Sequence, residues 1–278
     1  MAGVIGNTPP HQDGRPASQY RELAPHPSLV THLLCTWTQC ISDGRMEYPH
    51  RILPDGCVDI VWVNDTAPVV AGPATRACIA SLPPRLLLVG VRCRPGLAAS
   101  LLGVPAIELL NQEIPLRDVC ARLAAPLSSP VAEQQSVTGK LAGIEAALTT
   151  HLAAAGPADT LVTACIAWFA QHPRGRVHQL SRMMDLSSRQ LQRRFSTAVG
   201  YGPKTFQRIL RLQRVLALAR KTQVFDGKLS LLALETGYAD QAHMTREIQR
   251  LAGQQPTALL SKVDTTLGMS DLFKTETD

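Results

Sequence analysis

The last third of this sequence contains one residue pattern twice, at a constant offset of 53 positions. Each copy holds a helix-capping residue, two apolar core positions, an arginine, a glycine, a proline and a final apolar residue. The first copy comprises Ser187, Leu191, Arg193, Phe195, Gly200, Pro203 and Phe206, and the second comprises Asp240, Met244, Arg246, Ile248, Gly253, Pro256 and Leu259. One copy alone is typical of an ordinary amphipathic helix. Two copies without a register shift predict a duplicated small helical module.

The first module has the signals of a short helix followed by a capped second helix. Ser187 is a preferred cap, and Gln190 completes a capping box. Apolar residues then recur every fourth position, at Leu191, Phe195 and Val199. The opposite face presents Arg189, Gln192 and Arg193. This is a helix-turn-helix layout, in which the second helix fits a major groove about 12 Å wide and offers arginine to guanine and glutamine to adenine.

The second module repeats this layout. Gly237 ends its first helix, and Asp240 caps the next one, where an acidic side chain also suits the helix dipole. The residues left for the groove are Gln241, Ala242, His243, Thr245, Arg246 and Gln249. Residues 203–222 join the modules as one predicted helix of about 30 Å. That length is close to the roughly 34 Å of one DNA turn, so the two modules are predicted to read successive major grooves.

The charge distribution favours a polyanionic partner for the same region. Residues 172–262 contain 16 Lys and Arg against 5 Asp and Glu, whereas residues 1–171 contain 11 against 13. The whole chain has a formal net charge of +6. Because the excess is concentrated in the duplicated modules, we expect double-stranded DNA as the partner.

Composition also indicates the compartment. No apolar run approaches the roughly 20 residues that cross a membrane, and the N-terminus lacks the apolar core of a signal peptide. All seven cysteines precede Ala167, and none forms a Cys-x-x-Cys pair. We therefore expect a cytoplasmic protein without membrane partners, whose cysteines are small buried apolar residues.

The N-terminal half predicts an α+β domain in which short strands form a small β-barrel or sandwich with helices. The strand-like segments are 51–53, 58–63, 69–70 and 86–91, and the helix-like ones are 97–102 and 107–110. Turn residues such as Pro54-Asp55-Gly56 separate them. Residues 122–140 resemble a linker because they contain Pro126, Ser128 and Pro130.

The predicted domain boundaries follow from these patterns. We expect a disordered N-terminus, an α+β sensor or dimerisation domain that includes a linker helix, an all-α DNA-binding domain and a flexible tail. These cover residues 1–18, 19–155 with the helix at 141–152, 158–262 and 263–278. Within the DNA-binding domain, the two helix-turn-helix modules and the connecting helix cover about 177–198, 229–252 and 203–222.

Residues 163–261 resemble the DNA-binding domain of the AraC/XylS family of transcription regulators. The strongest likeness lies in Gly237-Tyr238-Ala239-Asp240-Gln241-Ala242-His243-Met244-Thr245-Arg246-Glu247 and in the Gly253-x-x-Pro256 that follows. The resemblance implies base contacts by Arg189, Gln192 and Arg193 in the first module, and by Gln241, Ala242, His243, Thr245 and Arg246 in the second. The chain departs from the family at Ile248 and Met244, where phenylalanine is common. In that family the second module often contributes less base specificity, so we expect the first to discriminate more.

The N-terminal half resembles a sensor-like domain found attached to such regulators. The likeness rests on Arg21-Glu22-Leu23-x-Pro25, Leu53-Pro54-Asp55-Gly56-Cys57-Val58-Asp59, Ala71-Gly72-Pro73 and Arg94-Pro95-Gly96. It implies binding of an unknown small-molecule effector, or formation of a homodimer. RNA polymerase is a further candidate partner of a regulator of this kind.

An alternative hypothesis is a thiol- or metal-dependent sensor or enzyme domain fused to a DNA-binding domain. Cys57 and Cys93 are its candidate redox cysteines, because Arg92 and Arg94 flank the latter and favour a thiolate. The candidate metal ligands are His32, Cys35, Cys40 and His50, but their spacing matches no common zinc pattern. Asp55 and Asp59 are interpreted as a turn residue and a strand-edge charge. The sequence therefore predicts no catalytic residues, no cofactor, no metal site and no enzymatic activity.

Overall fold

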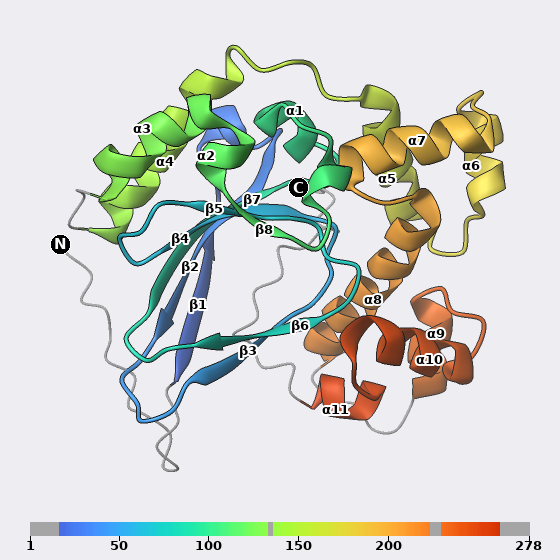
Figure 1. Ribbon diagram of the computed structural model, residues 1–278. Coiled ribbons are helices and arrows are strands. Elements are labelled where there is room, and N and C mark those ends of the chain that lie inside the picture. The colour runs from blue at the N-terminus through green and yellow to red at the C-terminus, as the bar shows by residue number, and fades with distance from the viewer. Residues whose placement is uncertain (1–16, 133–135, 223–228, 262–278) are drawn as a thin grey trace.

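The computed structural model describes residues 17–132, 136–222 and 229–261, which form a β-rich N-terminal half and an all-helical C-terminal half (Figure 1). The large sheet has the strand order β1-β2-β7-β4-β5-β8, and a second sheet pairs β3 with β6. Their bounds are β1 Ser18–Leu23, β2 Leu33–Ile41, β3 Tyr48–Ile52, β4 Val58–Val63, β5 Val69–Ala71, β6 Cys78–Leu82, β7 Leu87–Cys93 and β8 Glu113–Pro115. All strand pairs are antiparallel.

The two faces of the large sheet are covered by different layers, so the predicted α+β class is confirmed. Along β4, Val58, Ile60 and Trp62 face a helical layer, whereas Val61 and Val63 face the small β3–β6 sheet. This alternation follows from the two-residue period of a strand. The helical layer comprises α1 Ala98–Leu102, α2 Leu116–Val119, α3 Ala121–Ala132 and α4 Val137–Leu152, with the short 3-10 helices η1 Pro27–Leu29 and η2 Ala106–Leu109 (Figure 1).

The predicted linker over residues 122–140 is wrong, and the helix at 141–152 is not a linker helix. Helices α3 and α4 pack against the large sheet, where Leu123, Leu127 and Ile144 are fully buried. A proline inside a helix costs about 3 kcal/mol, which argues against a helix at Pro126. Burial of each leucine contributes about 1.5–3 kcal/mol, so the apolar stripe outweighs the helix-breaking residue.

In its described residues, the C-terminal half forms seven helices around one apolar core. They are α5 Thr160–Gln171, α6 Val177–Met183, α7 Ser188–Val199, α8 Pro203–Thr222, α9 Leu229–Glu235, α10 Gln241–Ala252 and α11 Pro256–Leu260. Phe169, Phe195 and Phe206 stack at its centre, with ring centroids 5.8–6.4 Å apart. Helices α6 and α7 form the first module, and α9 and α10 form the second, with the 20-residue α8 between them.

The two halves share an extensive interface. Gly200 at the end of α7 adopts φ 94° and lies against Pro73 and Ala106 of the N-terminal half. Gly56 adopts φ 88° and lies against Phe206 of α8. Hydrogen bonds cross the interface at several points, among them Gln213 Nε2 to Pro54 O at 2.6 Å, Ala77 N to Leu251 O at 2.7 Å, and Arg51 Nη1 to Ala252 O at 2.9 Å. The N-terminal half therefore holds α7, α8 and the end of α10 at once.

The predicted disordered N-terminus lies outside the described residues up to position 16, and β1 begins at Ser18. The predicted flexible tail at 263–278 also lies outside them. Within the described part of the chain, none of the helices combines the length and the apolar character that a membrane span requires.

Candidate nucleic-acid interface

Helix α7 presents one polar face to solvent because its cap and its core stripe fix its rotation. The backbone N–H of Gln190 donates to Ser187 Oγ at 3.2 Å, and the backbone N–H of Ser187 donates to Gln190 Oε1 at 2.9 Å. Leu191 and Phe195 are buried, so the opposite side faces outward. All three predicted base-reading residues of this helix, Arg189, Gln192 and Arg193, are exposed on that side.

Two polar side chains of α7, Arg194 and Gln192, contact other parts of the C-terminal half. Arg194 forms an ion pair with Asp159 at 2.8 Å, and Asp159 also caps α5. Arg194 is therefore tied to α5. The Gln192 side chain lies over Gly202, where any larger residue would collide with its amide, and donates to Ser196 Oγ at 3.4 Å.

The predicted base-reading residues of α10 fall into two groups by exposure. Gln241, Ala242 and Arg246 are exposed. His243 and Thr245 are half-buried and bonded within the module. The backbone N–H of Ala239 lies 3.4 Å from His243 Nδ1, and the His243 ring meets the Tyr238 ring edge-on at 5.4 Å. Thr245 Oγ1 donates to its own helix at Gln241 O, 2.9 Å away. The first group is free to contact bases, and the second also stabilises the module.

A basic groove lies between the two modules and was not predicted from the sequence. Its volume is about 580 Å³, and its polar lining includes Arg174, Arg176, His178, Lys204, Gln207, Arg211 and His243. No Asp or Glu is among its lining residues. The start of α6, the first turn of α8 and the turn before α10 each contribute to it. Because these segments are far apart in the sequence, the sequence indicated their excess of basic residues but not that they form a groove.

The arginines of α8 are structural supports. Arg208 forms an ion pair with Glu247 of α10. Arg211 lies 5.2 Å from the centroid of the Tyr238 ring. Arg214 Nη2 donates to Phe169 O at 2.8 Å, and burial together with Arg211 lowers the Arg214 pKa to about 10. Arg208 and Arg211 therefore hold the second module on α8, and Arg214 holds α5 on it.

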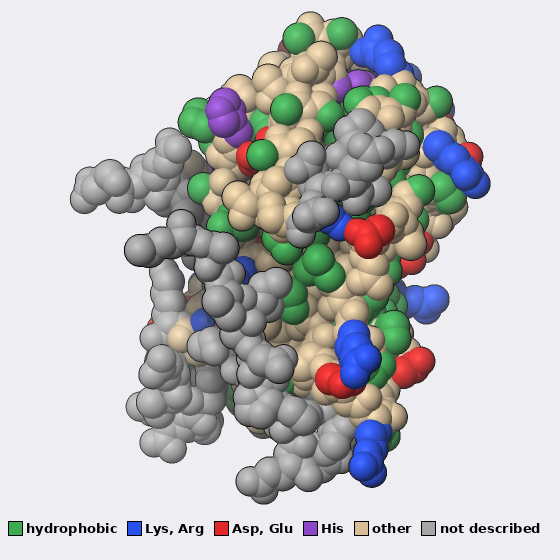
Figure 2. Space-filling model, turned by 90° about the vertical axis from the view of Figure 1, so that its left-hand side faces the viewer, with side chains coloured by type: hydrophobic (Ala, Val, Ile, Leu, Met, Phe, Trp, Pro, Cys, Tyr) green, Lys and Arg blue, Asp and Glu red, His purple; other side chains and the backbone are tan. Residues whose placement is uncertain are grey.

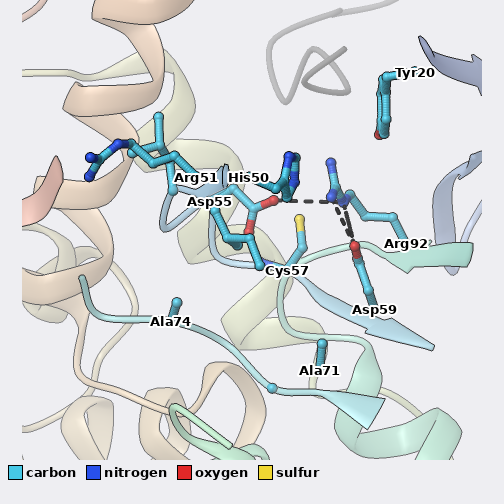
Figure 3. A pocket seen from close by; sticks show the side chains of 12 residues that line it. Tyr20, His50, Arg51, Asp55, Cys57, Asp59, Ala71, Ala74 and Arg92 are labelled. Atoms are coloured by element: carbon cyan, nitrogen blue, oxygen red, sulfur yellow. Dashed lines mark hydrogen bonds and ion pairs between the residues drawn. The ribbon is translucent and has the colours of Figure 1, made fainter. Parts of the chain in front are cut away.

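A second polar cluster lies inside the N-terminal half (Figure 3). Arg92 on β7 binds Asp59 on β4 with two donors, Nε at 3.0 Å from Oδ1 and Nη2 at 2.8 Å from Oδ2. Asp55 Oδ2 lies 3.6 Å from Arg92 Nε, and Glu22 Oε1 lies 3.8 Å from Arg92 Nη1. Burial raises the pKa of the Asp59 carboxyl, although Arg92 opposes this. Asp59 is therefore a buried partner on a central strand, which corrects its interpretation as a strand-edge charge.

Asp55 and the cysteines have local structural roles. Asp55 Oδ1 accepts from the backbone N–H of Cys57 at 2.9 Å, as expected of a turn residue. Burial raises the pKa of both the Cys57 and the Cys93 thiols, which disfavours the thiolate that a redox switch requires. Across the described residues, no group of three or more His, Cys, Asp or Glu side chains could hold a metal ion.

The exposed surface of the N-terminal half carries mixed charges. In the view of Figure 2, Lys and Arg side chains are interspersed with Asp and Glu over the part that is not grey. This fits the near balance of 11 basic and 13 acidic residues in positions 1–171. The basic groove, which has no acidic lining residue, therefore distinguishes the C-terminal modules from the N-terminal half.

Comparison with known proteins matches two segments of the chain to domain families. Residues 180–262 match a helix-turn-helix domain, and residues 21–115 match a domain of unknown function, DUF6597. No curated protein matches the sequence. Among solved structures, ToxT from Vibrio cholerae O395 is similar at 11% identity and a TM-score of 0.45, covering 90% of this chain and 98% of that chain. The same protein bound to (E)-4-(8-methylnaphthalen-1-yl)but-3-enoic acid is similar at 12% identity and 0.45, covering 90% and 100%.

Proposed function

We propose that this chain, whose residues 180–262 form a helix-turn-helix domain of the AraC type, reads its DNA site through two adjacent major grooves. The domain makes the chain a DNA-binding transcription regulator. The observation that carries the two-groove proposal is the pair of capped helices, α7 and α10, fixed to the single 20-residue helix α8 with a basic groove between them.

The contacts divide into base-reading and phosphate-binding groups. Arg189, Gln192 and Arg193 on α7, with Gln241, Ala242 and Arg246 on α10, contact base edges. His243 and Thr245 add contacts at the rim of the second helix. Arg174, Arg176 and Lys204 neutralise the phosphates that cross between the two major grooves, which makes the affinity dependent on salt.

The N-terminal half modulates this activity without catalysing a reaction. It contacts both modules, so a small molecule bound in it, or a second copy of the chain docked on it, changes the relative position of α7 and α10. RNA polymerase is the partner through which a bound regulator would act on transcription. The raised pKa values of the Cys57 and Cys93 thiols argue against a thiol enzyme in this domain.

Footprinting of genomic DNA with the purified full-length protein tests the proposal. We expect two protected segments on one face of the duplex, with centres about 10 base pairs apart. A variant with Arg189→Ala and Arg246→Ala together should lose both footprints, whereas Arg117→Ala, which removes an exposed arginine of α2, should keep them. A single protected segment from the native protein would show that only one module reads DNA.

A further inference from the structure

The N-terminal half contains a small cavity lined by both charged and apolar side chains. It has a volume of about 120 Å³ and lies between the large sheet, β3 and the turn that leads into β4. Its lining includes the polar residues Tyr20, His50, Arg51, Asp55, Asp59 and Arg92, and Figure 3 shows Asp55, Asp59 and Arg92 directed toward one another. The rest of the lining includes apolar side chains such as Ile52, Leu53 and Ala71.

We propose that this cavity binds a small uncharged ligand with a hydrogen-bond acceptor next to a donor, of the carboxamide class. The proposal deepens the modulation proposed above and rests on it, because the ligand would be the effector of the regulator. Four features of the cavity favour this ligand class: its donors, its acceptor, its charge balance and its size.

Arg92 supplies the donor. Its side chain is immobilised by Asp59, which stands directly opposite Arg92 in the β4–β7 register and occupies Nε and Nη2. A guanidinium has five N–H groups, so this pairing leaves Nη1 for another acceptor. Glu22, at 3.8 Å from Nη1, is too far for a hydrogen bond. An arginine held in this way is a rigid donor for a ligand carbonyl.

His50 supplies a second donor. Its Nδ1 lies 3.3 Å from Gln39 Nε2, an amide nitrogen that can only donate. In the assigned amide orientation Nδ1 is therefore the acceptor, and the proton of the neutral ring sits on Nε2. Burial, with a smaller effect of Arg92, lowers the pKa of His50, so the neutral ring persists at neutral pH.

Asp55 supplies the acceptor. Its Oδ1 is bound by the backbone N–H of Cys57, whereas its Oδ2 lies 3.6 Å from Arg92 Nε, beyond hydrogen-bond range. This second oxygen can accept from a ligand N–H. A primary carboxamide carries both complementary groups, a carbonyl oxygen for the Arg92 donor and an N–H for the Asp55 acceptor.

The charge balance excludes ions of either sign. Glu22, Asp55 and Asp59 surround the guanidinium of Arg92, so a carboxylate ligand beside it would add a fourth negative charge. The second arginine of the lining, Arg51, points away from this cluster. A cationic ligand would pair with Asp55 but would lie beside the like charge of the Arg92 guanidinium. An isolated charge buried without a partner is strongly disfavoured, so a neutral ligand is the one that fits.

The size of the cavity limits the ligand. An apolar cavity of about 150 Å³ holds one benzene molecule. A cavity of about 120 Å³ therefore holds about five or six non-hydrogen atoms. A short aliphatic amide satisfies this limit, with its alkyl group against Leu53 and Ala71.

The cavity wall also contacts the DNA-binding domain. Asp55 lies between two residues that contact α8. The carbonyl of Pro54 accepts a hydrogen bond from Gln213, and Gly56 lies against Phe206. In Figure 3 the Arg51 side chain points away from the polar cluster, and its Nη1 binds the last carbonyl of α10. A ligand that holds Asp55 therefore acts on the segment that fixes both modules.

Three probes of similar size test the ligand class on the full-length protein: propionamide, the isosteric anion propionate, and the cation propylammonium. Calorimetry or protein-observed NMR gives each dissociation constant. We expect propionamide to bind about tenfold or more tightly than either ion, since each ion leaves one buried polar group unpaired. Equal or tighter binding of an ion, or no binding by any of the three, overturns the proposal.

Asp55→Asn sharpens the test, because asparagine keeps the acceptor for Cys57 N–H but replaces the cavity-facing oxygen with an N–H₂ donor. The variant should lose preference for propionamide and shift toward propionate by about tenfold or more. Asp118→Asn, at an exposed position of α2, should keep the native order. Unchanged selectivity in Asp55→Asn overturns the assignment.

Gel-shift assays on the same samples separate this idea from the proposed function. Native protein that binds DNA but not propionamide overturns the ligand class and leaves the regulator intact. Protein that binds propionamide but no DNA, with or without the probe, overturns the regulator and leaves a ligand-binding site.

Discussion

At the residue scale, Arg193 is the side chain whose removal tests base reading most directly. It is exposed on α7, whereas its neighbour Arg194 is tied to Asp159. Arg193→Ala should weaken binding to the cognate site by about 1–3 kcal/mol and relax the base preference at one position. Quantitative gel shifts on a panel of single-base operator variants measure both effects. A uniform loss across all operators would instead assign Arg193 to a phosphate.

His50 gives a prediction about pH at the same scale. Its pKa is lowered from 6.5 in the folded state, chiefly by burial, so the unfolded chain binds a proton that the folded one rejects. Stability should be fully present above about pH 6.5 and fall below it, by at most about 1.4 kcal/mol per pH unit for this group. Urea unfolding across this range should show a shallower dependence in His50→Gln than in native protein. His178→Gln, at an exposed position, is the control, and parallel curves for both variants would contradict the prediction.

At the element scale, two glycines with similar backbone angles separate strain from packing. Gly200 and Gly103 have φ 94° and 75°, and alanine in this region costs about 1–2 kcal/mol. A Cβ on Gly200 would lie 2.6 Å from Pro73, whereas a Cβ on Gly103 would meet nothing within 4 Å. Gly200→Ala should therefore destabilise the protein by about 1–3 kcal/mol more than Gly103→Ala, as measured by chemical denaturation. Equal losses would mean that the contact between α7 and the N-terminal half is loose.

The sequence predicted the C-terminal elements well because their signals are local. The Ser187–Gln190 capping box and the left-handed glycines each lie within a few residues of the helix end they mark. In the N-terminal half, the predicted segments 58–63, 69–70 and 86–91 correspond to β4, β5 and β7, but β1 and β8 were not predicted. Strand β8 has three residues, and β1 has the largely polar sequence Ser-Gln-Tyr-Arg-Glu-Leu. These strands exist because neighbouring strands pair with them, which no short window of sequence reveals.

The same distinction holds for the candidate site. The cap fixes the rotation of α7, so its exposed residues were assignable from periodicity alone. The basic groove and the Arg92–Asp59 pair were not, because the first joins three distant segments and the second depends on the β4–β7 register. Asp59 was therefore interpreted as an edge charge, although the register places it opposite Arg92.

At the scale of the whole molecule, the segments 53–59, 71–73 and 94–96, singled out in the sequence, have one location in common. Gly56, Pro73 and Gly96 lie against Phe206, Gly200 and Ile166 of the C-terminal half. These segments thus form the surface on which the DNA-binding domain rests. Because the N-terminal half contacts both modules, it restricts how far apart α7 and α10 can move.

Arg51→Ala tests this restriction. Arg51 Nη1 binds the carbonyl of Ala252, the last residue of α10, where a positive charge also suits the helix dipole. Loss of a hydrogen bond from a charged group costs about 1.5 kcal/mol, which corresponds to about tenfold in an equilibrium. The second module should therefore move more freely in the variant. The preference of the variant for the native operator over one lengthened between the half-sites should fall by up to about tenfold in competition gel shifts.

Arg45→Ala is the control, because it removes an equal charge from an exposed loop and should keep the native preference. If both variants discriminate spacing as the native protein does, α8 alone sets the distance between the reading helices.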